Sequence, residues 1–269
     1  MNSTDPFVKF KEAQREGWAF FAPLQEATTR PAAALVKFAG VRSGDAVLDL
    51  ACGTGPVAVT AARAGAQVRA LDLTPALLEH ARHNASLAGV SIEFTEGDAE
   101  ALPYPDASFD VVLSQFGHMF APRPEVAVAG MLRVLKPGGR IAFSTWPPDL
   151  FTGRIFELVG KYLPPPAGAA PPQQWGDPNV VRARLGDAVS DLQFTVGVLY
   201  KPGLSVHHLR QFMEETAGPL VKLVKSLQGE PEKLAAYRRE MEALIADFYT
   251  DNALTQHFLM SRATKSSKS

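Results

Sequence analysis

The hydrophobic positions of the chain alternate between two spacings from about residue 30 to residue 150. Some segments have apolar residues three or four positions apart, which is typical of a helix with one buried face, and others are short apolar runs, which are typical of buried strands. The alternation predicts helices at 30–39, 57–64, 74–87 and 125–135, and strands at 46–50, 67–71, 91–95, 109–114 and 139–145. Strands separated by helices of this length indicate a parallel sheet covered by helices on both faces.

The pattern changes after Thr145. Eight prolines lie between Pro147 and Pro178, and they leave room for only a short apolar helix at 154–162. Further along, the spacing predicts a strand at 192–200, helices at 206–228 and 232–249, and a final strand at 254–263. We therefore expect a nucleotide-binding core that is interrupted by two insertions, rather than two independent domains.

Composition and charge narrow the class of protein. The 269 residues are 46% hydrophobic, which is enough for a sizeable core, and 27 Lys and Arg are balanced by 28 Asp and Glu. A surface for duplex nucleic acid needs a concentrated positive field, which no stretch of the chain supplies. The single cysteine, Cys52, excludes an internal disulfide, and no cysteine and histidine spacing predicts a metal site. Since no secretory signal or membrane-spanning run is visible, we expect a cytoplasmic protein with a small-molecule partner.

A glycine-rich turn follows the first predicted strand, in the stretch VLDLACGTG at 47–55. Residues 53–58, GTGPVA, match G-x-G-x-x-A, in which glycine permits positive φ and lets the backbone approach a ligand. Its place between a strand and a helix indicates a nucleotide-binding turn. Asp72 ends the second predicted strand, where its carboxylate can accept hydrogen bonds from both hydroxyls of a ribose. The alternative is that Asp72 only precedes the helix that Thr74 and Pro75 begin.

The carboxylate of Asp49, beside the glycine-rich turn, helps to distinguish between two kinds of cofactor. A dinucleotide presents a pyrophosphate to such a turn, and a carboxylate beside the turn repels those two negative charges at short range. A cofactor with a cationic end tolerates or favours the acid. S-adenosylmethionine is such a cofactor, because it has an adenosine, a sulfonium and an ammonium group but no phosphate.

Four motifs together resemble those of the class I S-adenosylmethionine-dependent methyltransferases, in particular the branch that includes the ubiquinone and menaquinone biosynthesis enzymes. They are VLDLACGTG, ALDLTP, GDAEALPYPDASFDVVLSQFGHMF and LKPGGRIAFSTW, in this order, within about residues 30–146. The resemblance implies an α/β, Rossmann-like three-layer sandwich with a seven-stranded, mostly parallel sheet, whose antiparallel last strand at 254–263 lies beside the fifth. Together with the pattern outside the motifs, we expect a single domain made of an N-terminal helical cap at 1–30, a cofactor-binding half at 31–146, a proline-rich insertion at 147–190, and a helical insertion at 204–252 that forms part of a substrate lid.

The resemblance also implies a set of residues that bind the cofactor, whose product is S-adenosyl-L-homocysteine. The carboxylate of Asp98 would accept a hydrogen bond from the adenine amino group, while the Ala99 N–H reaches a ring nitrogen. The full set is Asp49, Ala51, Gly53, Gly55 and the backbone of Ser114 for the methionine end, Asp72 for the ribose, and Leu73, Asp98 and Ala99 for the adenine.

The acceptor site is expected beyond the fourth strand. Transfer to oxygen or nitrogen often needs a base near the methyl group. His118 is the candidate base, because it follows the carboxyl end of that strand, where ligands bind in open α/β sheets; the alternative is that it only packs in its loop. Gln115 could orient a carbonyl or hydroxyl. The aromatic residues that could wall the pocket, or belong to ordinary packing, are Trp18, Phe21 and Trp146.

We therefore predict an enzyme that transfers a methyl group from S-adenosyl-L-methionine to a small organic acceptor, with oxygen preferred to nitrogen and nitrogen to carbon. Two alternatives stay open. One is a nicotinamide-dependent oxidoreductase, which Asp49 disfavours. The other is a protein that binds S-adenosylmethionine without catalysing a reaction.

Overall fold

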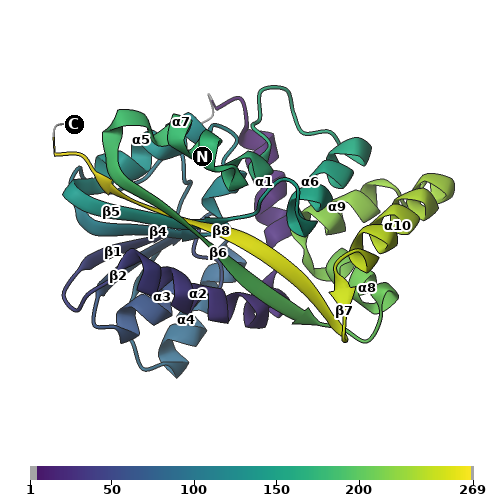
Figure 1. The fold of residues 1–269 in the computed structure, drawn as a ribbon, viewed down its shortest axis with the longest axis horizontal. Helices are drawn as coiled ribbons and strands as arrows, with labels where there is room; N and C mark the ends of the chain where they lie inside the picture. The colour runs from purple at the N-terminus through teal and green to yellow at the C-terminus, as the bar shows by residue number, and fades with distance from the viewer. Residues whose placement is uncertain (1–4, 268–269) are drawn as a thin grey trace.

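One mixed sheet runs through the computed structural model, which describes residues 5–267 (Figure 1). The strand order is β3-β2-β1-β4-β5-β8-β6, and β7 pairs with β8 beside this path. The strands β1 to β5 are parallel to one another, whereas β8 is antiparallel to both β5 and β6. The strands are β1 (Ala46–Leu50), β2 (Gln67–Asp72), β3 (Glu93–Glu96), β4 (Phe109–Gln115), β5 (Leu135–Thr145), β6 (Val189–Pro202), β7 (Tyr249–Thr250) and β8 (Ala253–Lys265).

The predicted architecture is confirmed, with one small difference in the number of strands. The segment 254–263 lies within β8, which pairs with β5 from Arg140 to Thr145 in the antiparallel sense. Eight strands are present instead of seven, because the structure adds the two-residue β7, which is too short to show a pattern in the sequence. The strand predicted at 192–200 is the central part of the longer edge strand β6.

Helices cover both faces of the sheet, with α2, α3 and α4 on one face and α5 and α7 on the other (Figure 1). Several begin with proline in the first turn, where its missing N–H has no cost, and α2 ends at Gly40 in the left-handed conformation. The helices are α1 (Val8–Trp18), α2 (Gln25–Ala39), α3 (Pro56–Arg63), α4 (Pro75–Leu87), α5 (Pro124–Val134), α6 (Phe151–Tyr162), α7 (Pro178–Leu185), α8 (Val206–Thr216), α9 (Gly218–Ser226) and α10 (Pro231–Ala246).

The single helix predicted at 206–228 is wrong, because the chain breaks there into α8 and α9. Ala217 between them has an extended backbone, with φ −90° and ψ 111°. Pro219 in the first turn of α9 explains the break, because it has no N–H to donate to the carbonyl of Glu215 and α8 therefore cannot continue through this position. The break lets α8 and α9 pack against α10 and α6 as separate rods.

The buried apolar residues form two separate clusters. The larger cluster surrounds the sheet and contains the inward faces of β1, β4 and β5. The smaller one lies among α6, α8, α9 and α10, and it includes Phe151, Leu209, Leu223, Tyr237 and Met241. The helices to the right in Figure 1 therefore have a core of their own.

The helices α8 to α10 form the loop of a long β-hairpin. Strands β6 and β8 pair continuously from Gln193 and Arg262 to Pro202 and Ala253. At the base of the loop, the Gly203 N–H donates to the carbonyl oxygen of Asn252 at 2.9 Å. The predicted insertion at 204–252 thus corresponds to one closed segment between two neighbouring strands.

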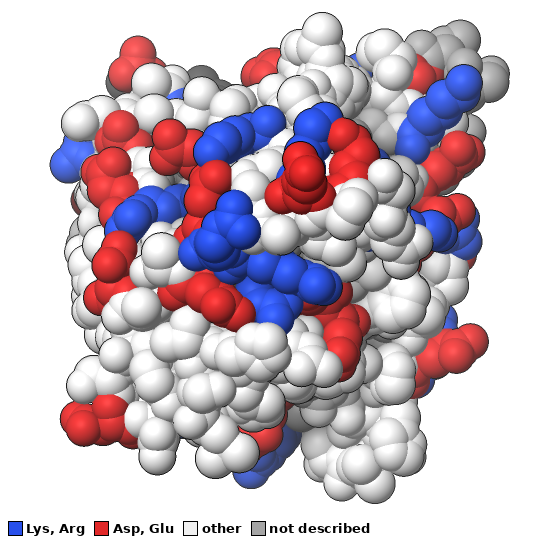
Figure 2. Space-filling model, turned by 90° about the vertical axis from the view of Figure 1, so that its right-hand side faces the viewer, with Lys and Arg blue, Asp and Glu red and all other residues white. Residues whose placement is uncertain are grey.

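The surface of this helical end mixes charges of both signs. Figure 2 shows basic side chains next to acidic ones over this face. Exposed ion pairs on the helices of this end include Lys161 with Glu240 and Lys233 with Glu230. The group of basic side chains near the middle of the view is bordered by acidic ones. Throughout residues 5–267, each helix is too short or too polar to cross a lipid bilayer.

Candidate functional site

A cavity of about 250 Å³ lies at the carboxyl ends of the parallel strands. This is the edge at which open α/β sheets bind ligands, because the loops that leave the strands diverge there. Its walls come from the loops after β1 to β5, from α1 and the start of α2, from α6, α8 and α9, and from the ends of β6 and β8. Segments from the whole length of the chain therefore meet in one site.

The glycine turn after β1 gives one wall of the cavity. Gly53 has φ +56°, and a Cβ added there would meet nothing within 4 Å, so the backbone at this point is open. Gly55 has φ +82°, and its Cβ would lie 3.1 Å from the Ala81 Cβ. Gly53 lines the cavity but Gly55 does not. Gly55 therefore has a local role in the structure, since it permits the turn and the close approach of α4.

Ala51, at the start of the same turn, lines the cavity and has φ +54°, which is uncommon for a residue with a Cβ. Phe116, at the end of β4, has φ +59° and also lines the cavity. Such left-handed residues store strain and concentrate at functional sites. The two strained positions are consistent with a site between the ends of β1 and β4.

Asp49 lies at the floor of the cavity, where its side chain is 1% exposed. One carboxylate oxygen, Oδ2, accepts from the Ala58 N–H at 2.9 Å, while Oδ1 has no hydrogen-bond partner among residues 5–267. Burial raises the pKa of Asp49 to about 8, and the nearby Asp72 adds to the rise. A buried carboxylate oxygen without a donor is costly unless a ligand supplies one.

Asp72 connects the end of β2 to the glycine turn. Its carboxylate accepts from the Gly53 N–H and from the Thr74 N–H, both at 2.8 Å. Burial raises the pKa of Asp72, although these backbone donors partly offset the effect. Asp72, Leu73 and Thr74 all line the cavity. The two interpretations of Asp72 are thus compatible, because one carboxylate both begins α4 and faces the site.

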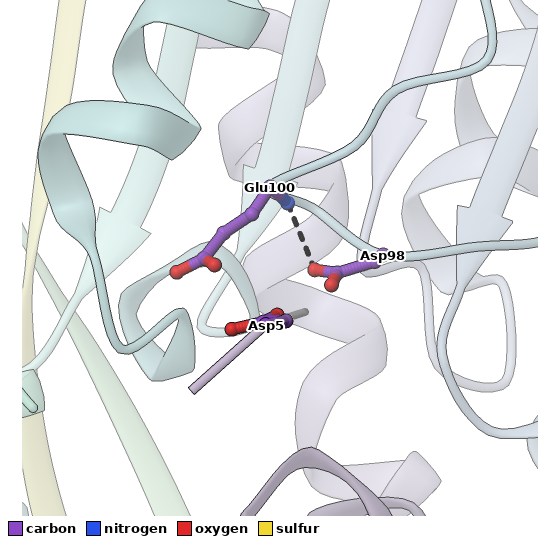
Figure 3. A group of neighbouring side chains, drawn as sticks. All are labelled: Asp5, Asp98 and Glu100. Carbon is purple, nitrogen blue, oxygen red and sulfur yellow. Dashed lines mark hydrogen bonds between the residues drawn. The ribbon is translucent and has the colours of Figure 1, made fainter. Parts of the chain in front are cut away.

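Asp98 follows β3 and belongs to a cluster of three carboxylates, with Asp5 and Glu100 (Figure 3). Its Oδ1 accepts from the Glu100 N–H at 2.9 Å. The Lys11 ammonium bridges all three acids, at 2.5 Å from Asp5, 2.7 Å from Asp98 and 2.7 Å from Glu100. The cluster is therefore neutralised by a lysine of α1, and Arg123 adds a second cation beside Glu100. Burial alone would lower the pKa of Lys11, but the three carboxylates raise it.

Ser114 joins the ends of two strands instead of facing the cavity. Its hydroxyl donates to the Leu50 carbonyl at 2.8 Å and accepts from the His118 N–H at 3.1 Å. It is buried and does not line the cavity, so the structure does not place it beside a ligand as expected. Gln115, the next residue, does line the cavity. Its Nε2 donates to the Thr28 carbonyl at 2.8 Å, whereas its Oε1 has no partner in the part of the chain that the structure describes.

His118 is fully buried and does not line the cavity, so its position favours the alternative that it packs in its loop. The ring is fully buried between Phe143 and Trp175, with centroid distances of 4.7 and 4.6 Å. Neither ring nitrogen has a hydrogen-bond partner within residues 5–267. Burial lowers the pKa of His118 to about 3, and the positive charge of Arg184 adds to the shift. A ring held neutral in an apolar contact is a packing residue and is unsuited to proton transfer near pH 7.

Aromatic residues form a further wall of the cavity. Trp146 stacks on Phe116 at 4.0 Å with an interplanar angle of 12°, and Trp18 makes edge contacts with Phe120 and Phe21 at 4.8 and 5.8 Å. All five line the cavity. The structure therefore brings together the three aromatic residues predicted from the sequence, and it adds Phe116 and Phe120.

The part of the cavity farthest in strand order from Asp72 and Asp98 is mainly apolar, and its individual residues were not predicted from the sequence. It is lined by Ile155 and Phe156 of α6, Met213 of α8, Leu220 of α9 and Leu199 of β6. Two polar side chains join this wall, Lys201 of β6 and Gln256 of β8, both 8% exposed. Neither residue could be identified from the sequence, because the pattern of a strand does not show which of its polar residues faces inward.

Helix α1 closes over the cavity by packing on α9. Gly17 and Gly218 meet backbone to backbone: a Cβ on Gly218 would lie 2.8 Å from the Gly17 carbonyl carbon. Trp18, the next residue of α1, lines the cavity beside this contact. The N-terminal segment is thus part of the enclosure, with Lys11 at one end and Gly17 near the other.

A protein-family model described as a methyltransferase domain matches residues 48–143 of the chain. An uncharacterized protein of Mycobacterium tuberculosis is 35% identical over 256 residues, which are 93% of this chain and 93% of that protein. The demethylmenaquinone methyltransferase of Deinococcus radiodurans is 42% identical over 128 residues, which are 46% of this chain and 53% of that enzyme. The crystal structure of the YcgJ protein of Bacillus subtilis is similar in fold, with a TM-score of 0.59 at 19% identity over 88% of this chain and 99% of that one.

Proposed function

Because the chain belongs to the class I S-adenosylmethionine-dependent methyltransferases, we propose that it transfers the methyl group of that cofactor to an oxygen atom of a small organic acceptor held in the apolar part of the cavity. As a member of this family it uses S-adenosyl-L-methionine and releases S-adenosyl-L-homocysteine. The membership decides against a nicotinamide-dependent oxidoreductase and against a protein that only binds the cofactor.

The residues at the ends of β1, β2 and β3 fit this cofactor. The unpartnered Oδ1 of Asp49 is a buried acceptor that an ammonium group would satisfy, and the open face of Gly53 leaves room for the sulfonium side. In the proposal, Asp49, Ala51 and Gly53 hold the methionine end, Asp72 holds the ribose, and Leu73, Asp98 and Ala99 hold the adenine. Gly55 and Ser114 are left out, because they do not line the cavity.

The cofactor supplies an electrophilic methyl group on a positively charged sulfur. The contribution of the protein is to hold the acceptor in line with that group and to keep water out. Positioning of this kind is worth roughly 7–11 kcal/mol of a barrier in favourable systems. The enclosure of the cavity by α1 and α9, together with the wall of Trp18, Phe116 and Trp146, is suited to both tasks.

The distribution of charge supports oxygen over nitrogen as the acceptor atom. Of the described residues that line the cavity, the acids are Asp49, Asp72 and Asp98, and all three lie at or just after the carboxyl ends of β1 to β3. The apolar part has no carboxylate to attract a cationic amine, and its ionisable group is the amine of Lys201. Gln115 and Gln256 can exchange hydrogen bonds with a hydroxyl or a carbonyl. We rank nitrogen next and carbon third.

We propose that the segments outside the family motifs form the lid of the acceptor site. The N-terminal cap at 1–30 contributes Trp18 and Phe21, and the proline-rich insertion at 147–190 contributes Ile155 and Phe156. The helical insertion at 204–252 contributes α8 and α9. We propose no nucleic-acid partner, which agrees with the mixed charges of the face in Figure 2.

The observation that carries the proposal is the buried carboxylate of Asp49 with an unsatisfied oxygen at the floor of the cavity. The first test is calorimetric titration of the purified protein with S-adenosylmethionine, S-adenosylhomocysteine and NAD. The second is release of S-adenosylhomocysteine with panels of phenols, carboxylic acids, amines and activated ring carbons. Binding of NAD alone would contradict the cofactor assignment, and turnover of amines in preference to the oxygen compounds would contradict the acceptor assignment.

A further inference from the structure

Lys201 is the least expected residue of the acceptor wall. It lies near the end of β6, where alternate residues face opposite sides of the sheet. Val198 and Tyr200 face solvent, and Leu199 and Lys201 face inward. The position is therefore one at which a strand of this pattern would have an apolar residue, and it is occupied by an amine that is 8% exposed.

The amine of Lys201 has no hydrogen-bond or ion-pair partner among the residues that the structure describes. Its Nζ lies 3.9 Å above the centre of the Phe212 ring, a contact that offsets only part of the loss of hydration. Burial lowers the pKa of Lys201 to about 7, and no carboxylate raises it again. Buried lysines are almost always paired, so a group of this kind has a cost in stability.

The surroundings of Lys201 define what would satisfy it. Leu199 lies two residues away on the same face, and Gln256 lies opposite Leu199 in the register of β6 and β8. With Met213 and Leu220 these residues form an apolar wall in which an ammonium and an amide donor are the polar groups. An apolar wall with two donors and no acid is complementary to an apolar molecule that carries an anionic oxygen.

Asp49 is the matching case in the other part of the cavity. Both residues are buried, both line the cavity and both keep a polar atom without a partner. Asp49 faces the site of a cationic cofactor. By the same physical argument Lys201 faces the site of an anionic ligand, because each buried polar atom gains its missing partner only when the ligand is bound.

We propose that Lys201 binds an anionic oxygen group, either a carboxylate or an ionised hydroxyl, of a mainly apolar methyl acceptor, with Gln256 as its neighbouring donor. This assignment rests on the proposed function, since it takes the apolar part of the cavity to be the acceptor site. It narrows the acceptor to organic acids and acidic phenols or enols. Neutral alcohols and cationic amines are excluded as preferred substrates.

The test uses matched pairs of probes on protein saturated with S-adenosylhomocysteine, measured by calorimetry at pH 6. The carboxylate pairs are cinnamate with cinnamamide and decanoate with decanamide, and the hydroxyl pair is 2,4-dinitrophenolate with 2,4-dinitroanisole. We expect at least one anion to bind about tenfold or more tightly than its neutral partner, as for the loss of one charge-assisted hydrogen bond. The pair that shows the preference identifies the oxygen group as carboxylate or ionised hydroxyl.

The variant is Lys201→Met, with Lys161→Met as its matched control. Lys161 lies on α6 with its side chain 60% exposed and paired with Glu240, so its replacement removes the same charge from the surface. Lys201→Met should abolish the preference for anions, and Lys161→Met should keep it. If Lys201→Met does not fold, Lys201→Gln takes its place in the same comparison.

A second measurement needs no probe. Without ligands at pH 7, Lys201→Met should melt about 2–4 °C above the wild type, because it removes an uncompensated buried amine from a chain of this size. The proposal would be overturned if Lys201→Met melted below the wild type or kept the preference for anions. It would also be overturned if the wild type bound each anion and its neutral partner equally, or bound none of the probes. If S-adenosylhomocysteine itself does not bind the wild type, the proposed function fails instead.

Discussion

The cavity has two halves that are built differently. The cofactor half consists of the loops after β1, β2 and β3, and its acids are fixed by backbone donors or by Lys11. The acceptor half consists of α6, α8, α9 and the ends of β6 and β8, and it is an apolar surface with one unpaired amine. In the proposed assignment, polar groups at the ends of strands hold the cofactor, and packed side chains from the inserted helices hold the acceptor.

The largest effect on binding is expected from Asp72→Ala, which changes a residue of the cofactor half. The change removes a carboxylate that holds the Gly53 and Thr74 N–H groups as well as the proposed ribose contacts. Loss of charge-assisted hydrogen bonds costs roughly 1.5–3 kcal/mol, so affinity for S-adenosylhomocysteine should fall by about 10- to 100-fold. Calorimetry measures this, with the exposed Asp106→Ala as control. If affinity is unchanged in a folded variant, the ribose is bound elsewhere and the division into halves is wrong.

The second prediction concerns Asp49 and pH. Since burial raises the pKa of Asp49 to about 8, the residue is protonated at neutral pH in the protein alone, and only its ionised form attracts the cationic cofactor. Affinity for S-adenosylmethionine should therefore rise by up to about tenfold per pH unit up to pH 8 and then level off. In Asp49→Asn the affinity should be lower and this slope should disappear. A slope that persists in Asp49→Asn would assign it to another group.

Asp49 also affects the stability of the fold, and its raised pKa determines whether stability rises or falls with pH. Between its ordinary value of 3.8 and about 8, Asp49 holds a proton in the folded state that the unfolded chain releases. Its contribution to the free energy of unfolding is therefore present at low pH and is lost as pH rises through this range. Without cofactor, Asp49→Asn should lack this loss, which melting curves from pH 4 to 8 can measure.

A smaller effect is expected from Gly218→Ala, which tests whether α1 couples the halves. The new Cβ would lie within 3.0 Å of the Gly17 backbone, so α1 and α9 have to separate slightly. We expect a loss of stability of about 1–3 kcal/mol and faster amide exchange in α1, as for overpacked contacts. The control is Gly160→Ala on α6, where a Cβ meets nothing within 4 Å. If affinity for the cofactor falls as well, the acceptor half and the cofactor half are coupled through α1 and Lys11. If the affinity does not change, the two halves are independent.

The smallest effect is expected from His118→Leu. Because the ring does not reach the cavity, turnover at pH 7 should stay close to wild type instead of falling by the ~10²–10⁴-fold typical of a lost general base. The pKa of His118 is lowered to about 3, so the unfolded chain binds a proton below pH 6.5 that the folded chain excludes. The wild type should therefore lose stability as pH falls from 6.5 towards 3, and His118→Leu should lose less.

The cofactor half could be predicted because its chemistry lies in short segments. Asp49, Gly53 and Asp72 stand at the ends of strands whose pattern is visible, and parallel strands bring those ends to one edge. Lys11 could not be predicted, since it pairs with Asp98 across 87 positions of the chain. Lys201 could not be predicted either, because its inward face depends on the pairing of β6 with β8 and on the packing of α8.

His118 shows a different limit. Its place beyond β4 was predicted correctly, but the sequence does not say to which side of the loop the ring turns. In the structure it turns into the contact with Phe143 and Trp175, two residues that come from β5 and from the proline-rich insertion. Trp175 lies 57 positions after His118 in the chain, so no local pattern predicts the contact between them. Packing between distant segments therefore sets the position of this ring.

The hairpin of β6 and β8 suggests how this scaffold can be diversified. Residues 204–251 leave and re-enter the sheet at neighbouring points, and the bond between Gly203 and Asn252 closes the gap without help from the helices. Replacement of the helices α8 to α10 alone, residues 206–246, leaves the pairing of β6, β7 and β8 in place, and insertions at exposed connections are widely tolerated. A protein engineer could therefore graft a different helical segment at this junction. The chain would then keep its methyl donor and acquire a new range of acceptors.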